Sequence, residues 1–201
     1  MPKLGMEPLR RRALVAATIA EIGAVGSLEV TVSNIARRAG VSSALAHHYF
    51  GSKDKLFLAA MRAVLTDFGA EVRAALRGVR DPRQRLSAIV RVSFSETSFR
   101  PEVIAAWLNF YVHAQNSDET QRLLRLYQAR LHTNLMHALR PLAGPRADTI
   151  ARTTAALIDG LYIRQALRDP APDARRAVQL VTDYLDDALA ASAPLPERTP
   201  A

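Results

Sequence analysis

Apolar residues recur along almost the whole chain at the spacing of three and four that places them on one face of an α-helix. Signals for strands are absent, since no stretch alternates apolar and polar residues between turn-forming clusters. Proline, glycine and other turn-forming residues interrupt the helical pattern at 78–82, 100–101, 116–118, 140–145 and 169–172. The pattern therefore predicts an all-α fold.

The first predicted helix carries an amphipathic stripe made of Leu14, Ala17, Thr18, Ile22 and Val25. Arginines at 10–12 before the apolar run ALVAATIA are also typical of a signal peptide, but Glu21 interrupts that run, so we predict a packed helix. No segment approaches the run of about 20 apolar residues that a bilayer-spanning helix needs. We therefore expect a cytoplasmic protein without a membrane partner.

Two short helices joined by a tight turn are predicted within residues 31–55, TVSNIARRAGVSSALAHHYFGSKDK. Thr31 can cap the first helix, and Gly40 can end it because glycine adopts the left-handed conformation without strain. Val41 can fill the angle between the helices, and Ser42 is placed to cap the second helix, 43–50. This arrangement is typical of a helix-turn-helix that reads DNA, although an ordinary helical corner also fits the pattern.

The second of these helices is predicted to turn Leu45 and Phe50 toward the core and to expose short side chains and a histidine to base edges. Basic and hydroxyl side chains around it suit phosphate oxygens. The expected DNA contacts are Thr31, Arg37, Ser42, Ser43, Ala44, His47, His48, Tyr49 and Lys53.

Residues 14–68 resemble the N-terminal domain of TetR-type transcriptional repressors. The resemblance rests on T-x-x-x-I-A-x-x-A-G-V-S, which runs from Thr31 to Ser42, and on a group of later residues, Tyr49, Phe50, Lys53 and Leu56. It implies a ligand-responsive DNA-binding repressor rather than an enzyme. Where the family usually has Gly, Leu and Tyr, this chain has Ala44, Ala46 and His47, so its operator sequence does not follow from the resemblance.

Charge and composition agree with a polyanion-binding protein. The chain of 201 residues has a formal net charge of +8, and residues 1–58 carry eight Lys or Arg against four acids. Such a basic region gains affinity for phosphates through counterion release, while a solvated basic surface without a partner is the alternative. The hydrophobic content of 49% is sufficient for a packed core.

The chain is predicted to divide into three parts. Residues 1–56 form the helix-turn-helix DNA-binding domain, 57–191 form a helical ligand-binding and dimerisation domain, and 192–201 form a disordered, proline-rich tail. A helix over about residues 54–77 links the first two parts and is the expected mechanical connection between them.

The last two predicted helices, 146–168 and 173–190, carry apolar stripes of Ile150, Thr154, Leu157, Ile158 and Leu161 and of Val178, Leu180, Val181, Tyr184 and Leu185. Read alone, such stripes are more often intramolecular core than interface. The resemblance implies instead that both helices pair with their copies in a homodimer. The two recognition helices then lie about 34–36 Å apart, and the double-stranded operator is near-palindromic.

Four of the few aromatic residues lie in two segments, 106–111 and 155–164, and these segments carry a narrower resemblance. AWLNFY at 106–111, AALIDGLYIR at 155–164 and the opening MPKLGM look like the choline-responsive members of the family, which control glycine betaine synthesis. Aromatic faces and a carboxylate suit a quaternary ammonium. The candidate ligand residues are Glu96, Trp107, Phe110, Tyr111, Asp159 and Tyr162.

Alternatives to this ligand site remain open at the level of sequence. The aromatic residues could be core, with Asp159 paired to Arg152 or Arg164. The effector could also be another small molecule, such as an aldehyde, a lipid or a drug. A helical enzyme or a sequence-blind nucleoid protein is a further class.

Residues that could support catalysis or metal binding are sparse. The absence of cysteine excludes thiolate nucleophiles, disulfides and Cys-type zinc sites. His132 and His137 are five apart and do not share a helix face, and no strained turn presents a serine. We therefore expect no catalytic residue, no metal and no cofactor beyond the small-molecule effector.

Overall fold

The computed structural model describes residues 5–168 and 173–192. Over these residues the chain is helical and contains no strand, which confirms the predicted all-α class. The helices are α1 (Met6–Val25), α2 (Val32–Arg38), α3 (Ser43–Phe50), α4 (Lys53–Ala75), α5 (Pro82–Ser93), α6 (Pro101–Ala114), α7 (Asp118–Ala143), the 3-10 turn η1 (Gly144–Arg146), α8 (Ala147–Arg168) and α9 (Ala174–Ala190). Within the described segments, no helix combines the length and apolarity needed to cross a membrane.

Most predicted breaks coincide with real helix ends, but one is wrong in its first part. The break expected at 140–145 begins only after Ala143, because α7 continues through Pro141 and ends at Gly144, whose φ is 49°. Proline at 141 removes the N–H that would bond to the carbonyl four residues earlier, and α7 ends two residues later. The chain also leaves α5 at Phe94, before the break expected at 100–101. The break expected at 169–172 lies outside the described residues.

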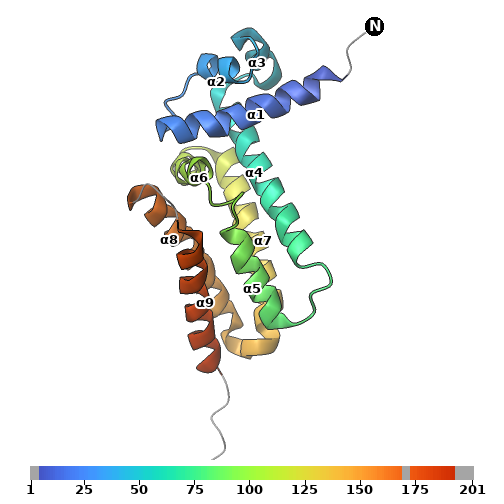
Figure 1. Cartoon of the computed structure of the whole chain (residues 1–201), viewed down its shortest axis with the longest axis vertical. Coiled ribbons are helices and arrows are strands. Elements are labelled where there is room, and N and C mark those ends of the chain that lie inside the picture. Colours follow the sequence, from blue (N-terminus) through green and yellow to red (C-terminus); the bar gives the residue numbers. More distant parts are fainter. Residues whose placement is uncertain (1–4, 169–172, 193–201) are drawn as a thin grey trace, which may run out of the picture.

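The first three helices form a small unit that sits across the end of a longer helical bundle (Figure 1). Leu14 and Ile22 of α1 are fully buried against Ile35 and the rest of the N-terminal core. Val25, the last residue of the predicted stripe, is 51% exposed, because α1 ends there and the chain turns away at Gly26 with φ 75°. The stripe is therefore correct up to Ile22.

The central helix α4 belongs to both parts of the molecule. Two residues separate its start from the end of α3, and it runs down the bundle beside α5 and α7 (Figure 1). Its buried residues Leu56, Phe57 and Met61 pack in one continuous core with residues from α1 and from α6. The expected domain boundary at 56/57 thus falls inside a continuous helix.

Helix α6 crosses directly beneath α1, and the crossing is close at Gly23 (Figure 1). A Cβ atom at Gly23 would lie 2.3 Å from Cβ and 2.6 Å from Cα of Glu102 on α6. The side-chain amide of Asn109, also on α6, donates a hydrogen bond of 3.3 Å to the carbonyl oxygen of Gly26. The absent side chain at Gly23 therefore allows the backbones of the two helices to approach.

Replacing Gly23 by alanine should destabilise the protein by about 2 kcal/mol, because overpacking against backbone costs about 1–3 kcal/mol. Urea unfolding measures this difference. Gly69→Ala on α4 is the matched control: its Cβ would meet only the flexible guanidinium of Arg73, at 3.3 Å. Equal stability of the two variants would mean that α1 and α6 can separate without cost.

Candidate functional site

The helix-turn-helix forms as its capping residues predict. The Thr31 hydroxyl accepts a hydrogen bond from the Asn34 N–H at 3.1 Å, which caps α2. Gly40 has φ 68°, and the N–H of Val41 donates to the Ala36 carbonyl at 3.0 Å, so the turn is closed by backbone contacts. Such local interactions fix the angle at which α3 leaves α2.

Ser42 caps helix α3, because its hydroxyl accepts a hydrogen bond from the Leu45 N–H at 3.2 Å. Ala44, His47 and His48 are exposed. The prediction that Leu45 turns to the core needs correction, because Leu45 is only half-buried and Ala46 is 1% exposed. The small side chain of Ala46 lets α3 lie close to the helices beneath it, so the buried face is shifted by one residue.

Arg11 on α1 holds the end of α3 in place. Its guanidinium donates a 2.7 Å hydrogen bond to the Tyr49 carbonyl and lies 4.9 Å from the centre of the Tyr49 ring and 5.3 Å from that of Phe50. Glu7 accepts a further bond from Arg11 at 2.8 Å. Sequence reasoning did not assign this role, although the run of arginines at 10–12 was the available signal.

Several of the predicted DNA contacts already have partners inside the chain. Lys53 donates from Nζ to the Leu28 carbonyl at 2.9 Å, and Arg37 donates to Oδ1 of Asn34 at 2.9 Å. Nδ1 of His47 lies 3.1 Å from the carbonyl oxygen of Gly51, its own helix end. Nε2 of His47 has no hydrogen-bond partner among the described residues.

The exposed face of α3 thus presents short side chains, hydroxyls and imidazoles, and cationic residues surround it on neighbouring helices. The major groove admits one α-helix, and base edges there are read by side chains of this kind. Thr31 and Lys53 lie at the starts of α2 and α4, where helix N-termini suit phosphate oxygens.

A cluster of aromatic rings lies in the bundle where α6, α7 and α8 meet. The Trp107 ring centre is 5.7 Å from that of Tyr111, 4.7 Å from that of Tyr127 and 6.2 Å from that of Tyr162. All of these rings except Tyr111 are less than 10% exposed. The structure therefore brings together the predicted aromatic residues of α6 and α8, and it adds Tyr127 from α7.

Asp159 is the carboxylate of this cluster. The Tyr111 hydroxyl donates to its Oδ1 at 2.9 Å, and burial raises the pKa of Asp159 to about 6. Burial and the nearby Asp159 both raise the pKa of Tyr111, so its hydroxyl stays protonated and remains a donor. Among the described residues Asp159 has no cationic partner; Arg152 pairs instead with Asp148 at 2.8 Å.

Other predicted ligand residues occupy different surroundings. Phe110 is fully buried; its ring lies 5.6 Å from that of Trp107 and 6.4 Å from that of Phe57, so it joins the cluster to the core. Glu96 is not part of the cluster, because its side chain is exposed on the turn after α5. The carboxylate that orders this turn is Glu71 of α4, which accepts from the hydroxyls of Ser95 and Thr97.

Tyr162 connects the cluster to the same turn. Its hydroxyl donates to the carbonyl oxygens of Ser93 and Ser98, and its ring centre lies 5.1 Å from that of Phe99. Sequence reasoning missed Tyr127, whose signal was its position on the buried face of α7, four residues before Leu131.

One side of the cluster opens to a cavity of about 460 Å³ between α7 and α8. Tyr127 and Asp159 form its inner wall, and His132 and Arg152 lie at its margin. Both of these basic side chains bond to Asp148, with N–O distances of 2.9 Å and 2.8 Å. The arrangement suits a small cationic ligand, because the carboxylate of Asp159 and electron-rich ring faces lie together.

Two families match separate parts of the chain. Residues 14–60 match the TetR family of bacterial regulatory proteins, and residues 82–190 match the C-terminal domain of BetI-type transcriptional repressors.

Full-length relatives agree with both matches. The HTH-type transcriptional regulator BetI of Brucella melitensis biotype 2 is 58% identical over 186 residues, which cover 92% of this chain and 94% of the relative. BetI of Agrobacterium fabrum is 56% identical over 187 residues, covering 92% of this chain and 91% of the relative.

Solved structures show the same fold. A transcriptional regulator from Pseudomonas aeruginosa PAO1 superposes with a TM-score of 0.78 at 28% identity, covering 94% of this chain and 93% of its own. A regulator from Saccharomonospora viridis, solved in complex with choline, has a TM-score of 0.79 at 22% identity and covers 88% of this chain and 95% of its own. With its helix-turn-helix, its helical bundle and these relatives, the chain belongs to the TetR family of DNA-binding transcriptional regulators and, within that family, to the BetI-type repressors.

Proposed function

We propose that this repressor takes choline as its effector and controls genes for the synthesis of glycine betaine from choline. The observation that carries the proposal is the buried carboxylate of Asp159, which lacks a cationic partner among the described residues and is surrounded by aromatic rings. The alternative is a repressor of the same type that responds to another small cationic or hydrophobic ligand. The BetI relatives and the choline bound in the regulator of the same fold favour choline.

Choline is a cation, and it would supply the positive charge that Asp159 lacks among the described residues. Its trimethylammonium group carries a positive charge without hydrogen-bond donors, so it is held by ring faces and by a nearby carboxylate. In the proposed complex the ammonium group enters through the cavity between α7 and α8, contacts Tyr127 and neutralises Asp159. Trp107 and Tyr162 lie behind these residues and contact the methyl groups once the rings part.

Helices α8 and α9 supply the proposed dimer interface. Ile150, Ile158 and Val181 are buried within the protomer, so part of each predicted stripe is intramolecular core. Other apolar side chains stay outside the core: Leu180 is 39% exposed and Leu167 is 68% exposed. A second copy that covers these side chains would place the two α3 helices for a near-palindromic operator.

Helix α6, which carries two residues of the proposed effector site, contacts the N-terminal helices near both of its ends. Helix α6, which carries Trp107 and Tyr111, crosses α1 at Gly23. At its other end, Nε2 of His113 lies 3.6 Å from Oδ1 of Asp54, in the first turn of α4. A shift of α6 on choline binding would therefore reach α1 as well as α4, and a coupling of about 1–3 kcal/mol changes operator affinity by about 5- to 150-fold.

Substitutions on the DNA-reading face should separate base contacts from phosphate contacts. His47→Ala should change which operator sequence is preferred, at about 1–3 kcal/mol for a lost base contact. Lys53→Ala should weaken binding to all sequences alike. Gel shifts with the upstream DNA of the chain's own gene and with random DNA of equal length measure both effects. If the two variants behave identically, α3 does not enter the groove in the orientation proposed.

The positive charge of choline, and not only its shape, should contribute to its binding. Titration followed by the fluorescence of Trp107 should show saturable binding of choline and at least tenfold weaker binding of 3,3-dimethylbutanol, its neutral isostere, since a partly desolvated cation–π contact is worth about 2 kcal/mol. Asp159→Asn keeps the shape and the acceptor for Tyr111 but should weaken choline binding strongly. Equal affinity for the two ligands would point to a different effector.

The raised pKa of Asp159 predicts a pH dependence with a definite sign. Choline needs the ionised carboxylate, so its affinity should fall as the pH drops below about 6, and the Asp159→Asn variant should lack this change. A flat wild-type profile between about pH 5 and pH 8 would contradict the assignment of Asp159.

The stability of the protein should fall as the pH rises, whereas its affinity for choline should rise. The pKa is about 6 in the folded protein against an ordinary 3.8, so between these values the folded state holds a proton that the unfolded state has lost. Raising the pH through this window should lower the free energy of unfolding by about 3 kcal/mol in the wild type relative to Asp159→Asn. Urea unfolding at the two ends of the window measures the difference, and parallel curves would contradict it.

A further inference from the structure

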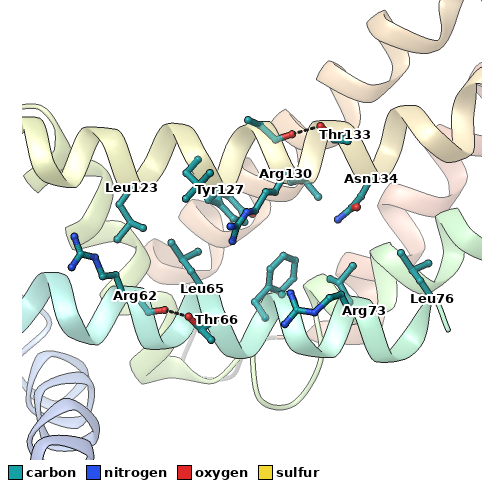
Figure 2. A pocket seen from close by; sticks show the side chains of 16 residues that line it. Arg62, Leu65, Thr66, Arg73, Leu76, Leu123, Tyr127, Arg130, Thr133 and Asn134 are labelled. Carbon is teal, nitrogen blue, oxygen red and sulfur yellow. Dashed lines mark hydrogen bonds between the residues drawn. The ribbon is translucent and has the colours of Figure 1, made fainter.

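A second and larger cavity, of about 620 Å³, lies between α4 and α7 (Figure 2). Its volume is within the range of about 300–1,000 Å³ that is usual for small-molecule sites. Most of its lining is apolar, with Leu65 and Val72 from α4 facing Leu123 and Leu131 from α7. None of the residues predicted as ligand contacts lines it.

The polar part of this groove is cationic. Arg62, Arg73 and Arg130 line it, and no Asp or Glu of the described residues does. Arg62 pairs with Glu119 at 3.0 Å, whereas neither Arg73 nor Arg130 has an ion-pair partner among the described residues. Figure 2 shows Arg130 extending from α7 toward the gap between the helices, with Arg73 along α4 on the opposite wall.

Gly69 keeps the floor of the groove open beneath Arg73. A Cβ at Gly69 would lie 3.3 Å from a terminal nitrogen of the Arg73 guanidinium. The guanidinium therefore lies over the glycine at the edge of the groove, where Arg73 remains exposed to solvent. Arginine binds carboxylate or phosphate with paired hydrogen bonds. Two guanidinium groups beside an apolar groove therefore suit a ligand with an anionic head group and a hydrocarbon tail.

This groove is electrostatically opposite to the cavity at Asp159. Both cavities are lined in part by Tyr127, whose side chain is 8% exposed and stands between them. A quaternary ammonium is attracted to the carboxylate on one side of Tyr127 and repelled by the arginines on the other. Asp159 and these arginines would therefore favour ligands of opposite charge.

We propose that the groove between α4 and α7 is a second ligand site, which takes an anionic amphiphile: a carboxylate or phosphate head on an unbranched apolar tail. The head contacts Arg73 and Arg130, and the tail lies along the leucines of α4 and α7. Since only two residues separate α4 from α3, an occupant of this groove touches the helix that positions the DNA-reading unit. The proposal is independent of choline as effector.

Calorimetric titration with four probes of equal tail length tests the proposal. Decanoate and decyl phosphate carry anionic heads, decanol is neutral, and decyltrimethylammonium is cationic; all are used below their micelle concentrations. We expect both anions, or one of them, to bind at least tenfold more tightly than decanol and the cation. A preference for one anion identifies the head group, whereas equal binding of all four probes, or no binding, would overturn the proposal.

Charge reversal locates the site. The double variant Arg73→Glu, Arg130→Glu should weaken the anions at least tenfold and strengthen decyltrimethylammonium. Arg125→Glu is the matched control, because Arg125 is exposed on α7 but does not line the groove. Thermal unfolding confirms that each variant folds. If Arg125→Glu weakens the anions as much as the double variant does, the effect comes from general surface charge and the groove is not the site.

Discussion

The close crossing of α1 over α6 at Gly23 is the constraint that sets how the first three helices sit on the helical bundle. Because no side chain intervenes, the backbones meet, and the amide of Asn109 bonds to the end of α1 at Gly26. Helix α6 carries Trp107 and Tyr111, so the same helix contacts the DNA-reading unit on one face and forms the aromatic cluster on another. A larger residue at position 23 would separate these two elements and remove their direct connection.

Basic side chains at the surface of the N-terminal part also hold its helices together. Arg11 fixes the end of α3, Arg38 of α2 pairs with Glu21 of α1, and Lys53 of α4 bonds to the Leu28 carbonyl. The pair of Arg38 and Glu21 is partly exposed, and such pairs individually contribute little to stability. The three contacts matter for geometry, because together they set the position of α3 relative to α1 and α4 before DNA binds.

The C-terminal bundle has one cavity beside the carboxylate of Asp159 and another beside Arg73 and Arg130. Desolvation of Asp159 makes its ionised form costly, which is why its pKa rises and why a cationic ligand would be favoured there. Arg73 and Arg130 remain at the surface, where water reduces the cost of their charge. Tyr127, Ala129 and Leu131 of α7 line both cavities and lie between the acidic site and the basic one.

The amino-acid sequence by itself determined the helical class, most helix ends and the turn between α2 and α3, because caps, glycine turns and apolar spacing act over a few residues. Thr31, Gly40 and Ser42 behave as their local chemistry requires. Only the tertiary structure placed Tyr127 beside Trp107, left Glu96 outside the cluster, buried Ala46 in place of Leu45 and set Arg11 on the end of α3. Each of these outcomes depends on how helices distant in sequence pack against one another, and periodicity within one helix does not specify which neighbour its residues will meet.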